Sequence, residues 1–184
     1  MSVILIIVVI ALILYCIVLY NRLVRLRMII KNAWAQIGVQ LKRRHDLIPN
    51  LVNAVKGYMK YEQETLNKVM EARAKAVSAT SVPEASKAEG ELSGVLSRLF
   101  ALFENYPDLK ANQNVMALQE ELTTTENQIA YARQHYNDSV MQYNIALQVF
   151  PNNIIATVFN FKAEDTFLET TEVEKEVPKV DLNL

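Results

Sequence analysis

Five consecutive charged or titratable residues, Lys42 to Asp46, are the strongest candidates for chemistry in this chain of 184 residues. Clustered Lys and Arg bind anions such as phosphate groups or acidic side chains, because several positive charges lie close together. Consecutive residues point to different sides of a helix, so four basic groups in a row spread around it. Complementation of the negative end of a helix dipole is the competing, structural interpretation. The predicted interaction surface comprises Lys42, Arg43, Arg44 and His45.

Other chemistry finds little support in the sequence. A di-iron centre in a helical bundle needs Glu three residues before His on two helices. The residues at that spacing are Lys42 before His45 and Ala132 before His135. The single cysteine cannot form an intramolecular disulfide or a cysteine-based metal site. Phosphate-binding loops, nucleophile elbows and dinucleotide fingerprints do not occur in the sequence. We therefore predict no catalytic residue, no metal ligand, no cofactor and no small-molecule substrate, and the chain is not expected to be an enzyme.

The elements that position these residues are expected to be long helices. The chain has 4 Gly and 5 Pro, whereas average usage would give about 13 and about 9. Because turns depend on these residues, the chain has few turns and therefore long elements. From Asn21 onward, apolar residues recur at every third or fourth position, which is typical of amphipathic helices packed on one another.

The first 20 residues form an uncharged, apolar run that predicts a permanent membrane anchor. A helix needs about 20 apolar residues to cross about 30 Å of hydrocarbon. The alternatives are a cleaved signal peptide, which would have a basic start and a small-residue cleavage site, and a lipoprotein signal, which would have small residues before Cys16. The run has neither feature. The predicted anchor residues are Val3, Ile4, Leu5, Ile6, Ile7, Val8, Val9, Ile10, Ala11, Leu12, Ile13, Leu14, Tyr15, Cys16, Ile17, Val18, Leu19 and Tyr20.

The few breaking residues set the helix boundaries. Asp46 and Asp108 are expected as N-caps, and a short helix is expected to begin at Asn152 or Asn153. The break near Pro49 has an alternative, a kinked helix that continues through it. The predicted long helices span about 22–46, 47–78, 84–105 and 108–149. The fold class is all-α, with an N-terminal transmembrane helix that continues into an antiparallel up-and-down four-helix bundle. The predicted domains are the anchor at 1–20, the bundle at 21–168 and a flexible acidic tail at 169–184.

Basic residues follow the anchor at once and predict its orientation. An excess of Lys and Arg marks the cytoplasmic flank of a membrane helix. The N-terminus would therefore lie outside and the body in the cytoplasm. The topology-determining residues are Arg22, Arg25, Arg27 and Lys31.

The near-neutral total charge hides a strong polarisation along the chain. Residues 21–75 carry a net charge of +8, residues 76–150 carry −5, and residues 151–184 carry −4. Three interpretations remain: a basic face near anionic lipid, head-to-tail association between copies, or packing of oppositely charged helices within one bundle. Nucleic-acid binding is not expected, because the basic region lacks clustered aromatic residues and follows an anchor.

A Tyr-Asn pair occurs twice at a spacing of one heptad, which places both pairs on one helix face. Buried amides need hydrogen-bond partners and can fix the register between helices. A tryptophan on the apolar stripe of the first long helix is expected to pack in the core. The predicted packing or oligomer seam comprises Trp34, Tyr136, Asn137, Tyr143 and Asn144.

Several segments resemble the bacterial LemA family. They are NAWAQIGVQLKRRHDLIPNLV at 32–52, VKGY at 55–58, YPDLKAN at 106–112, LQEELTTTENQIAYARQHYNDSV at 118–140, YN at 143–144, FPNN at 150–153 and FNF at 159–161. The resemblance covers about residues 20–167. It implies long antiparallel helices behind an N-terminal anchor in the bacterial inner membrane, but no activity.

These features together predict a membrane-anchored structural or scaffold protein that self-associates through its helical bundle. At about 1.5 Å per residue, the basic cluster would lie about 35 Å beyond the end of the anchor. That distance favours contact with a neighbouring copy or another protein over contact with lipid. The expected partners are the lipid bilayer, further copies of the chain and a possible protein partner. The alternative function is an adaptor that binds another membrane protein, such as a sensor or transporter.

Overall fold

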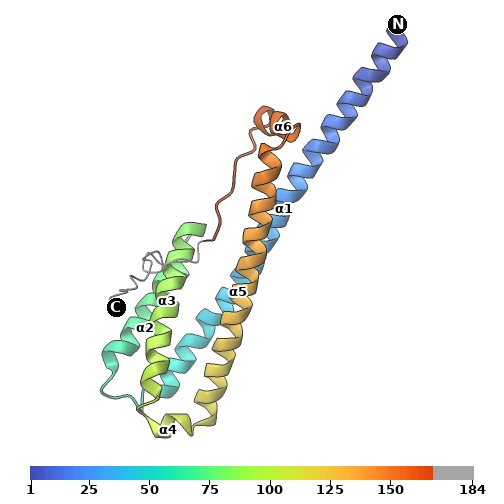
Figure 1. Cartoon of the computed structure of the whole chain (residues 1–184). Helices are drawn as coiled ribbons and strands as arrows, with labels where there is room; N and C mark the ends of the chain where they lie inside the picture. Colours follow the sequence, from blue (N-terminus) through green and yellow to red (C-terminus); the bar gives the residue numbers. More distant parts are fainter. Residues whose placement is uncertain (168–184) are drawn as a thin grey trace, which may run out of the picture. The chain divides into compact units, whose positions relative to one another are not determined.

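The computed structural model describes residues 1–167, and over these residues the protein is helical without strands (Figure 1). The all-α prediction with a long apolar N-terminal helix is therefore confirmed. The predicted tail at 169–184 lies outside the described residues. The elements are α1 (Ser2–Val55), α2 (Gln63–Ser78), α3 (Val82–Phe103), α4 (Pro107–Lys110), α5 (Gln113–Gln148) and α6 (Asn152–Val158).

The chain divides into two compact units, which are described separately. Unit 1 comprises Met1–Leu41 and Asn127–Thr166. Unit 2 comprises Lys42–Glu126 and, of the described residues after α6, Phe167. The long helices α1 and α5 each contribute one part to each unit.

The core of unit 2 is apolar and takes residues from α1, α2, α3 and α5. In α2, Leu66, Val69, Ala72 and Ala76 are buried at the spacing of an amphipathic helix. Ile48 and Leu51 of α1, Leu92 and Leu99 of α3, and Val115 and Leu122 of α5 belong to the same cluster. The apolar residues predicted from their helical spacing thus largely form the core of unit 2. Tyr58, which shares that spacing, is exposed.

The predicted helix break near Asp46 and Pro49 is wrong, and the alternative of a continuous helix is correct. Pro49 lies inside α1, which continues to Val55. Proline cannot donate to the carbonyl four residues earlier, here that of His45. Instead, the Arg73 Nε of α2 donates to the His45 carbonyl oxygen at 2.6 Å. A side chain from another helix therefore satisfies the carbonyl group that Pro49 leaves without a partner.

The starts of α3 and α5 have identifiable caps. Ser81 and Glu84 form a capping box at the start of α3, in which each side chain accepts from the other residue's backbone N–H. The last long helix does not begin at Asp108 as predicted. Pro107 opens the single turn α4, and the Asn112 Oδ1 then accepts from the backbone N–H groups of Asn114 and Val115 at the start of α5.

Unit 1 joins the N-terminal part of α1 to the C-terminal part of α5 and to α6 (Figure 1). Leu19 and Leu23 of α1, Ala146 of α5, and Ile155 and Ala156 of α6 form its buried cluster at this end. The short helix predicted after Pro151 is therefore present as α6, and it packs against α1.

Candidate functional site

Arg44 lies at the centre of a buried charge cluster in unit 2. Its side chain forms ion pairs with Glu89 of α3 and Glu126 of α5. Its Nη1 also donates to Ser93 Oγ at 3.0 Å, and Ser93 Oγ donates to Glu126 Oε1 at 3.1 Å. Arg44 and Glu89 are fully buried, whereas the Glu126 side chain is 41% exposed, so the cluster reaches solvent through Glu126. Three helices are held together by one guanidinium group.

His45 completes the charge cluster from the same turn of α1. Its Nε2 lies 2.7 Å from Glu89 Oε1. Burial alone would raise the pKa of the Glu89 carboxyl, but the hydrogen bond with His45 and the positive charge of Arg44 outweigh it and lower that pKa. Glu89 is therefore an ionised, paired carboxylate at neutral pH rather than a protonated acid.

The structure separates the predicted interaction surface into two pairs. Lys42 and Arg43 are exposed, but Arg44 and His45 are buried. The four side chains do not splay around a helix end, because α1 continues past them. The signal that could have revealed this was spacing: Leu41, Arg44 or His45, and Ile48 follow one another at core intervals. Glu89 was not among the predicted site residues, although it lies three residues before Leu92 on the buried stripe of α3.

Unit 2 also explains much of the charge polarisation along the sequence. Arg43 pairs with Glu121 of α5, and Lys75 of α2 lies 3.7 Å from Glu91 of α3. With the ion pairs of Arg44, these contacts join the basic segment at 42–75 to the acidic segment at 84–126. Within unit 2, oppositely charged helices therefore pack side by side, which is the intramolecular interpretation of the charge pattern.

The predicted seam residues lie within unit 1. Trp34 of α1 packs on Tyr136 of α5, with ring centroids 5.6 Å apart. Tyr143 is fully buried, and Asn137 is half-buried on the same helix. Four of these residues come from α5, so the heptad spacing of the Tyr-Asn pairs places them along one side of that helix.

Tyr136 and Asn144 bind the segment that follows α6. The Tyr136 hydroxyl donates to the Asp165 carbonyl oxygen at 2.9 Å. Asn144 pairs twice with the backbone of Glu164, since its Nδ2 donates to the carbonyl at 2.9 Å and its Oδ1 accepts from the N–H at 3.1 Å. Burial raises the pKa of Tyr136, and the carboxylates of Glu164 and Asp165 raise it further, so the phenol keeps its proton.

The predicted anchor residues are mostly exposed. Leu5 and Ile13 are 65% and 54% exposed, and of the run only Cys16 is half-buried and Leu19 buried. A water-soluble core helix would bury such side chains. Of the residues predicted to set topology, Arg22, Arg25 and Lys31 are exposed and Arg27 is half-buried. The Arg27 Cζ lies over the ring of Phe161, 5.5 Å from the ring centroid.

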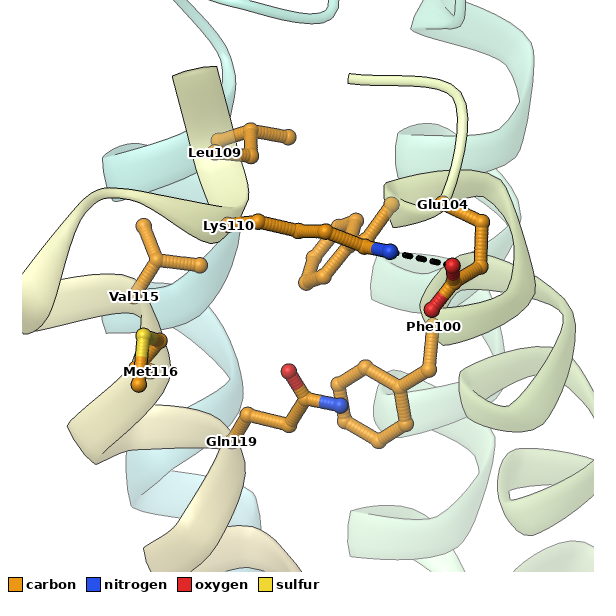
Figure 2. Close-up of a pocket in the computed structure, with 8 residues that line it drawn as sticks. Phe100, Glu104, Leu109, Lys110, Val115, Met116 and Gln119 are labelled. Carbon is orange, nitrogen blue, oxygen red and sulfur yellow. Dashed lines mark hydrogen bonds and ion pairs between the residues drawn. The ribbon is translucent and has the colours of Figure 1, made fainter. Parts of the chain in front are cut away.

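Unit 2 contains a small cavity between α3, α4 and α5, with a volume of about 270 Å³. Figure 2 shows Phe100 and Gln119 on opposite sides of it, and Lys110 reaching across to pair with Glu104. Pockets for small molecules usually measure about 300–1,000 Å³. The lining residues offer apolar surface, one amide and one ion pair, and include no histidine or cysteine.

The fold and these sites define a helical protein with one N-terminal helix that is long and apolar enough to cross a membrane. Across the described part of the chain, no group of three or more His, Cys, Asp or Glu side chains could hold a metal ion. The model of the LemA family matches residues 33–182. The chain belongs to the LemA family, and the resemblance seen in the sequence is confirmed.

Individual relatives match over different lengths. The chain is similar to Protein LemA of Metamycoplasma hominis, at 28% identity over 157 residues, which cover 84% of this chain and 71% of the relative. It is also similar to magnetosome protein MamQ 2 of Paramagnetospirillum magneticum, at 32% identity over 82 residues, and to magnetosome protein MamQ of Magnetospirillum gryphiswaldense, at 30%. These matches cover 45% of this chain and 30% of the magnetosome proteins.

Proposed function

We propose that this chain is a single-pass, membrane-anchored structural protein that self-associates through its helical body. The observation that carries the proposal is the continuity of α1, whose exposed apolar end passes without a break into the helices of the body. An anchor joined by a flexible linker would let the body move freely. A helix that is both anchor and core element of unit 1 instead fixes that unit to the bilayer, as a scaffold requires.

We also propose that the body is an antiparallel up-and-down four-helix bundle. The support is the single apolar core built from α1, α2, α3 and α5. The connections between these helices, at 56–62, 79–81 and 104–112, are short. Short connections favour antiparallel neighbours.

A structural role agrees with the use of the ionisable groups in unit 2. Arg44, His45 and Glu89 are the groups that most resemble a catalytic cluster, but they pair with one another in the core. A general acid or base must reach a substrate, whereas these three groups are buried and paired. We therefore propose that the protein is not an enzyme and needs no cofactor.

Self-association is supported by an exposed groove in unit 1, with a volume of about 560 Å³. Val39 of α1 and Tyr131 of α5 line it and are 65% and 74% exposed. Exposed apolar and aromatic side chains beside amide groups are typical of protein interfaces. Gln36, Gln40 and Gln128 supply the amides.

The native mass of the full chain in detergent tests self-association. We expect a homo-oligomer that Tyr131→Glu dissociates, whereas the matched control Ala130→Glu, which places the same charge on an adjacent face, leaves the assembly intact. A monomer over a wide range of concentrations would refute the scaffold. Crosslinking in cells separates the scaffold from an adaptor, because an adaptor would yield one stoichiometric foreign partner rather than adducts between copies.

Localisation and orientation form part of the same proposal. We place the anchor in the bacterial inner membrane, with the N-terminus outside and the body in the cytoplasm, because exposed Arg22, Arg25 and Lys31 follow the apolar run. A Thr80→Cys variant in a Cys16→Ala background tests the orientation. An impermeant thiol reagent should label position 80 only after the cells are opened. Strong labelling of intact cells would indicate the opposite orientation, with the body outside.

A further inference from the structure

The short helix α6 carries an exposed apolar stripe on the side away from its packing face. Ile154 and Val158 lie one turn apart on α6 and are 53% and 69% exposed, and Phe150, just before the helix, is 78% exposed. On the other side, Ile155 and Ala156 are buried against α1 and α5. The apolar side chains that could have entered the core of unit 1 therefore point outward instead.

The sequence around α6 lacks charge. Residues 139–161 contain no Asp, Glu, Lys, Arg or His, so 23 consecutive residues are uncharged. An exposed helix in water usually carries charged residues on its outer face. An exposed apolar patch of this kind marks a surface that contacts another protein or a membrane.

The position of α6 in unit 1 distinguishes between these two surfaces. Leu19 and Leu23 of α1 belong to the same apolar cluster as Ile155 and Ala156, and Cys16 packs against that cluster. Figure 1 shows α6 beside α1. Tyr20 lies against Phe159, with ring centroids 4.8 Å apart. The helix therefore lies beside residues 16–20, the last turn of the apolar run.

The charged flank of the apolar run sets the depth of this turn in a bilayer. The run is long enough to cross about 30 Å of hydrocarbon, which takes about 20 residues at about 1.5 Å each. It ends at Tyr20 and is followed by the polar Asn21 and by Arg22, the first charged residue. Residues 16–20 are therefore the last turn before the charged flank, and any element packed beside them lies at the edge of the hydrocarbon.

The turn after α6 places an aromatic residue, Phe161, next to α1. Asn160 has a φ of 54°, in the left-handed region that Asn tolerates well. The N–H of Phe161 donates to the Ala156 carbonyl at 2.9 Å, and that of Asn160 to the Thr157 carbonyl at 3.2 Å, which is a Schellman cap. The cap brings Phe161 between Tyr20 and Arg27.

The resulting order of side chains is apolar, then aromatic, then basic. Aromatic residues favour the membrane interface, and Arg beyond them favours anionic headgroups. We propose that α6, together with Phe150, is a second membrane-contacting element that lies in the interface of the bilayer that α1 crosses. This inference rests on the proposed anchor, and it commits the apolar stripe to lipid rather than to a second copy.

Fluorescent labels on single cysteines in the full chain test this inference. In a Cys16→Ala background, Val158→Cys reports on α6, Ala130→Cys is the matched exposed position on the body of unit 1 outside the proposed groove, and Ile10→Cys reports on the anchor. The labelled protein is reconstituted into vesicles of phosphatidylcholine and phosphatidylglycerol. Two quenchers are compared: aqueous iodide, and lipids that carry a nitroxide either near the headgroup or deep in the acyl chain.

The label at position 158 should be quenched by the shallow nitroxide, and iodide should quench it at least about threefold less than the label at position 130. Equal iodide quenching at both positions would overturn the inference. Protection from iodide without nitroxide quenching would also overturn it and would indicate that a protein covers α6. The label at position 10 separates the two proposals, because loss of deep nitroxide quenching there would refute the anchor itself.

Discussion

The two units join their helices by different kinds of polar contact. Unit 2 places a charge cluster in its interior, with Arg44 between Glu89 and Glu126. Unit 1, at the level of α6, relies on apolar and aromatic contacts and on neutral hydrogen bonds such as that of Asn144 to the Glu164 backbone. Both solutions hold segments that are far apart in the sequence.

The contrast follows from where each unit would lie in the proposed arrangement. Buried ion pairs are geometrically demanding, and loss of one partner leaves an uncompensated charge. Such pairs give a specific fit where water surrounds the protein. Beside a bilayer, an unpaired charge costs more, and the uncharged stretch at 139–161 avoids that cost. Charge complementarity therefore adds to an apolar core in unit 2, whereas the membrane end of unit 1 relies on shape and neutral polar groups.

The largest expected effect comes from removing the centre of the charge cluster. Arg44→Met should lower the free energy of unfolding by about 3–5 kcal/mol, because Glu89 then remains buried without the positive charge of Arg44. The adjacent Arg43→Met is the matched control and should cost at most about 1 kcal/mol, because its pair with Glu121 is exposed. Urea unfolding in detergent, followed by circular dichroism, measures both. Similar losses for the two variants would show that burial of the cluster is unimportant.

Acid should weaken unit 2 through the same cluster, by less than the loss of Arg44. The pKa of Glu89 is lowered from its ordinary value of 4.5 when the protein folds. Its stabilising contribution is therefore complete above about pH 4.5 and is lost as the pH falls through the lower pKa of the folded state. The urea concentration at the midpoint of unfolding should decrease as the pH decreases through this window. Glu89→Gln should make that midpoint less dependent on pH. An unchanged slope in the variant would remove Glu89 as the responsible group.

A smaller effect is expected for the neutral link in unit 1. Asn144→Leu removes two hydrogen bonds to the backbone of Glu164 and should cost about 1–3 kcal/mol. Hydrogen exchange at the Glu164 amide should accelerate correspondingly, whereas Gln142→Leu, at an exposed position, should leave it unchanged. If exchange accelerates equally in both variants, the Asn144 contacts do not hold the segment after α6.

The smallest effect concerns a charged group that serves the backbone in unit 2. Arg73 donates to the His45 carbonyl, which Pro49 leaves without its usual partner. In a Pro49→Ala background a backbone N–H can take over, so Arg73→Leu should cost about 1 kcal/mol less than in the natural chain. A double-mutant cycle of urea unfolding measures this coupling. Additive effects would indicate that Arg73 acts independently of Pro49.

Much of the architecture was predictable because helical periodicity is a local property. The apolar spacing at 66–76 and 92–99 identified residues that are buried in α2 and α3. The sequence could not decide between a break at Pro49 and a helix that continues through it, because proline usually breaks a helix. The compensating donor, Arg73, lies 28 residues away in the sequence. Sequence spacing alone cannot reveal such a partner.

The charge cluster illustrates the same limit for the candidate site. A run of four basic residues normally indicates a solvent-exposed surface, so Arg44 and His45 were predicted together with Lys42 and Arg43. Their burial depends on Glu89 and Glu126, which lie on other helices. A charge on an apolar stripe was the available signal, and it becomes informative when an opposite charge lies on the stripe of a second helix.

By itself, the sequence determined the helical class, the apolar N-terminal run, the family and the polarisation of charge. These properties depend on composition, local periodicity and short motifs, which are written along one segment at a time. The tertiary structure decided which charges are buried, how α1 continues past Pro49 and where the segment after α6 is held. These depend on contacts between segments that are distant in the chain. The placement of α6 beside residues 16–20 is such a contact, and it turns an unremarkable apolar helix into a candidate membrane surface.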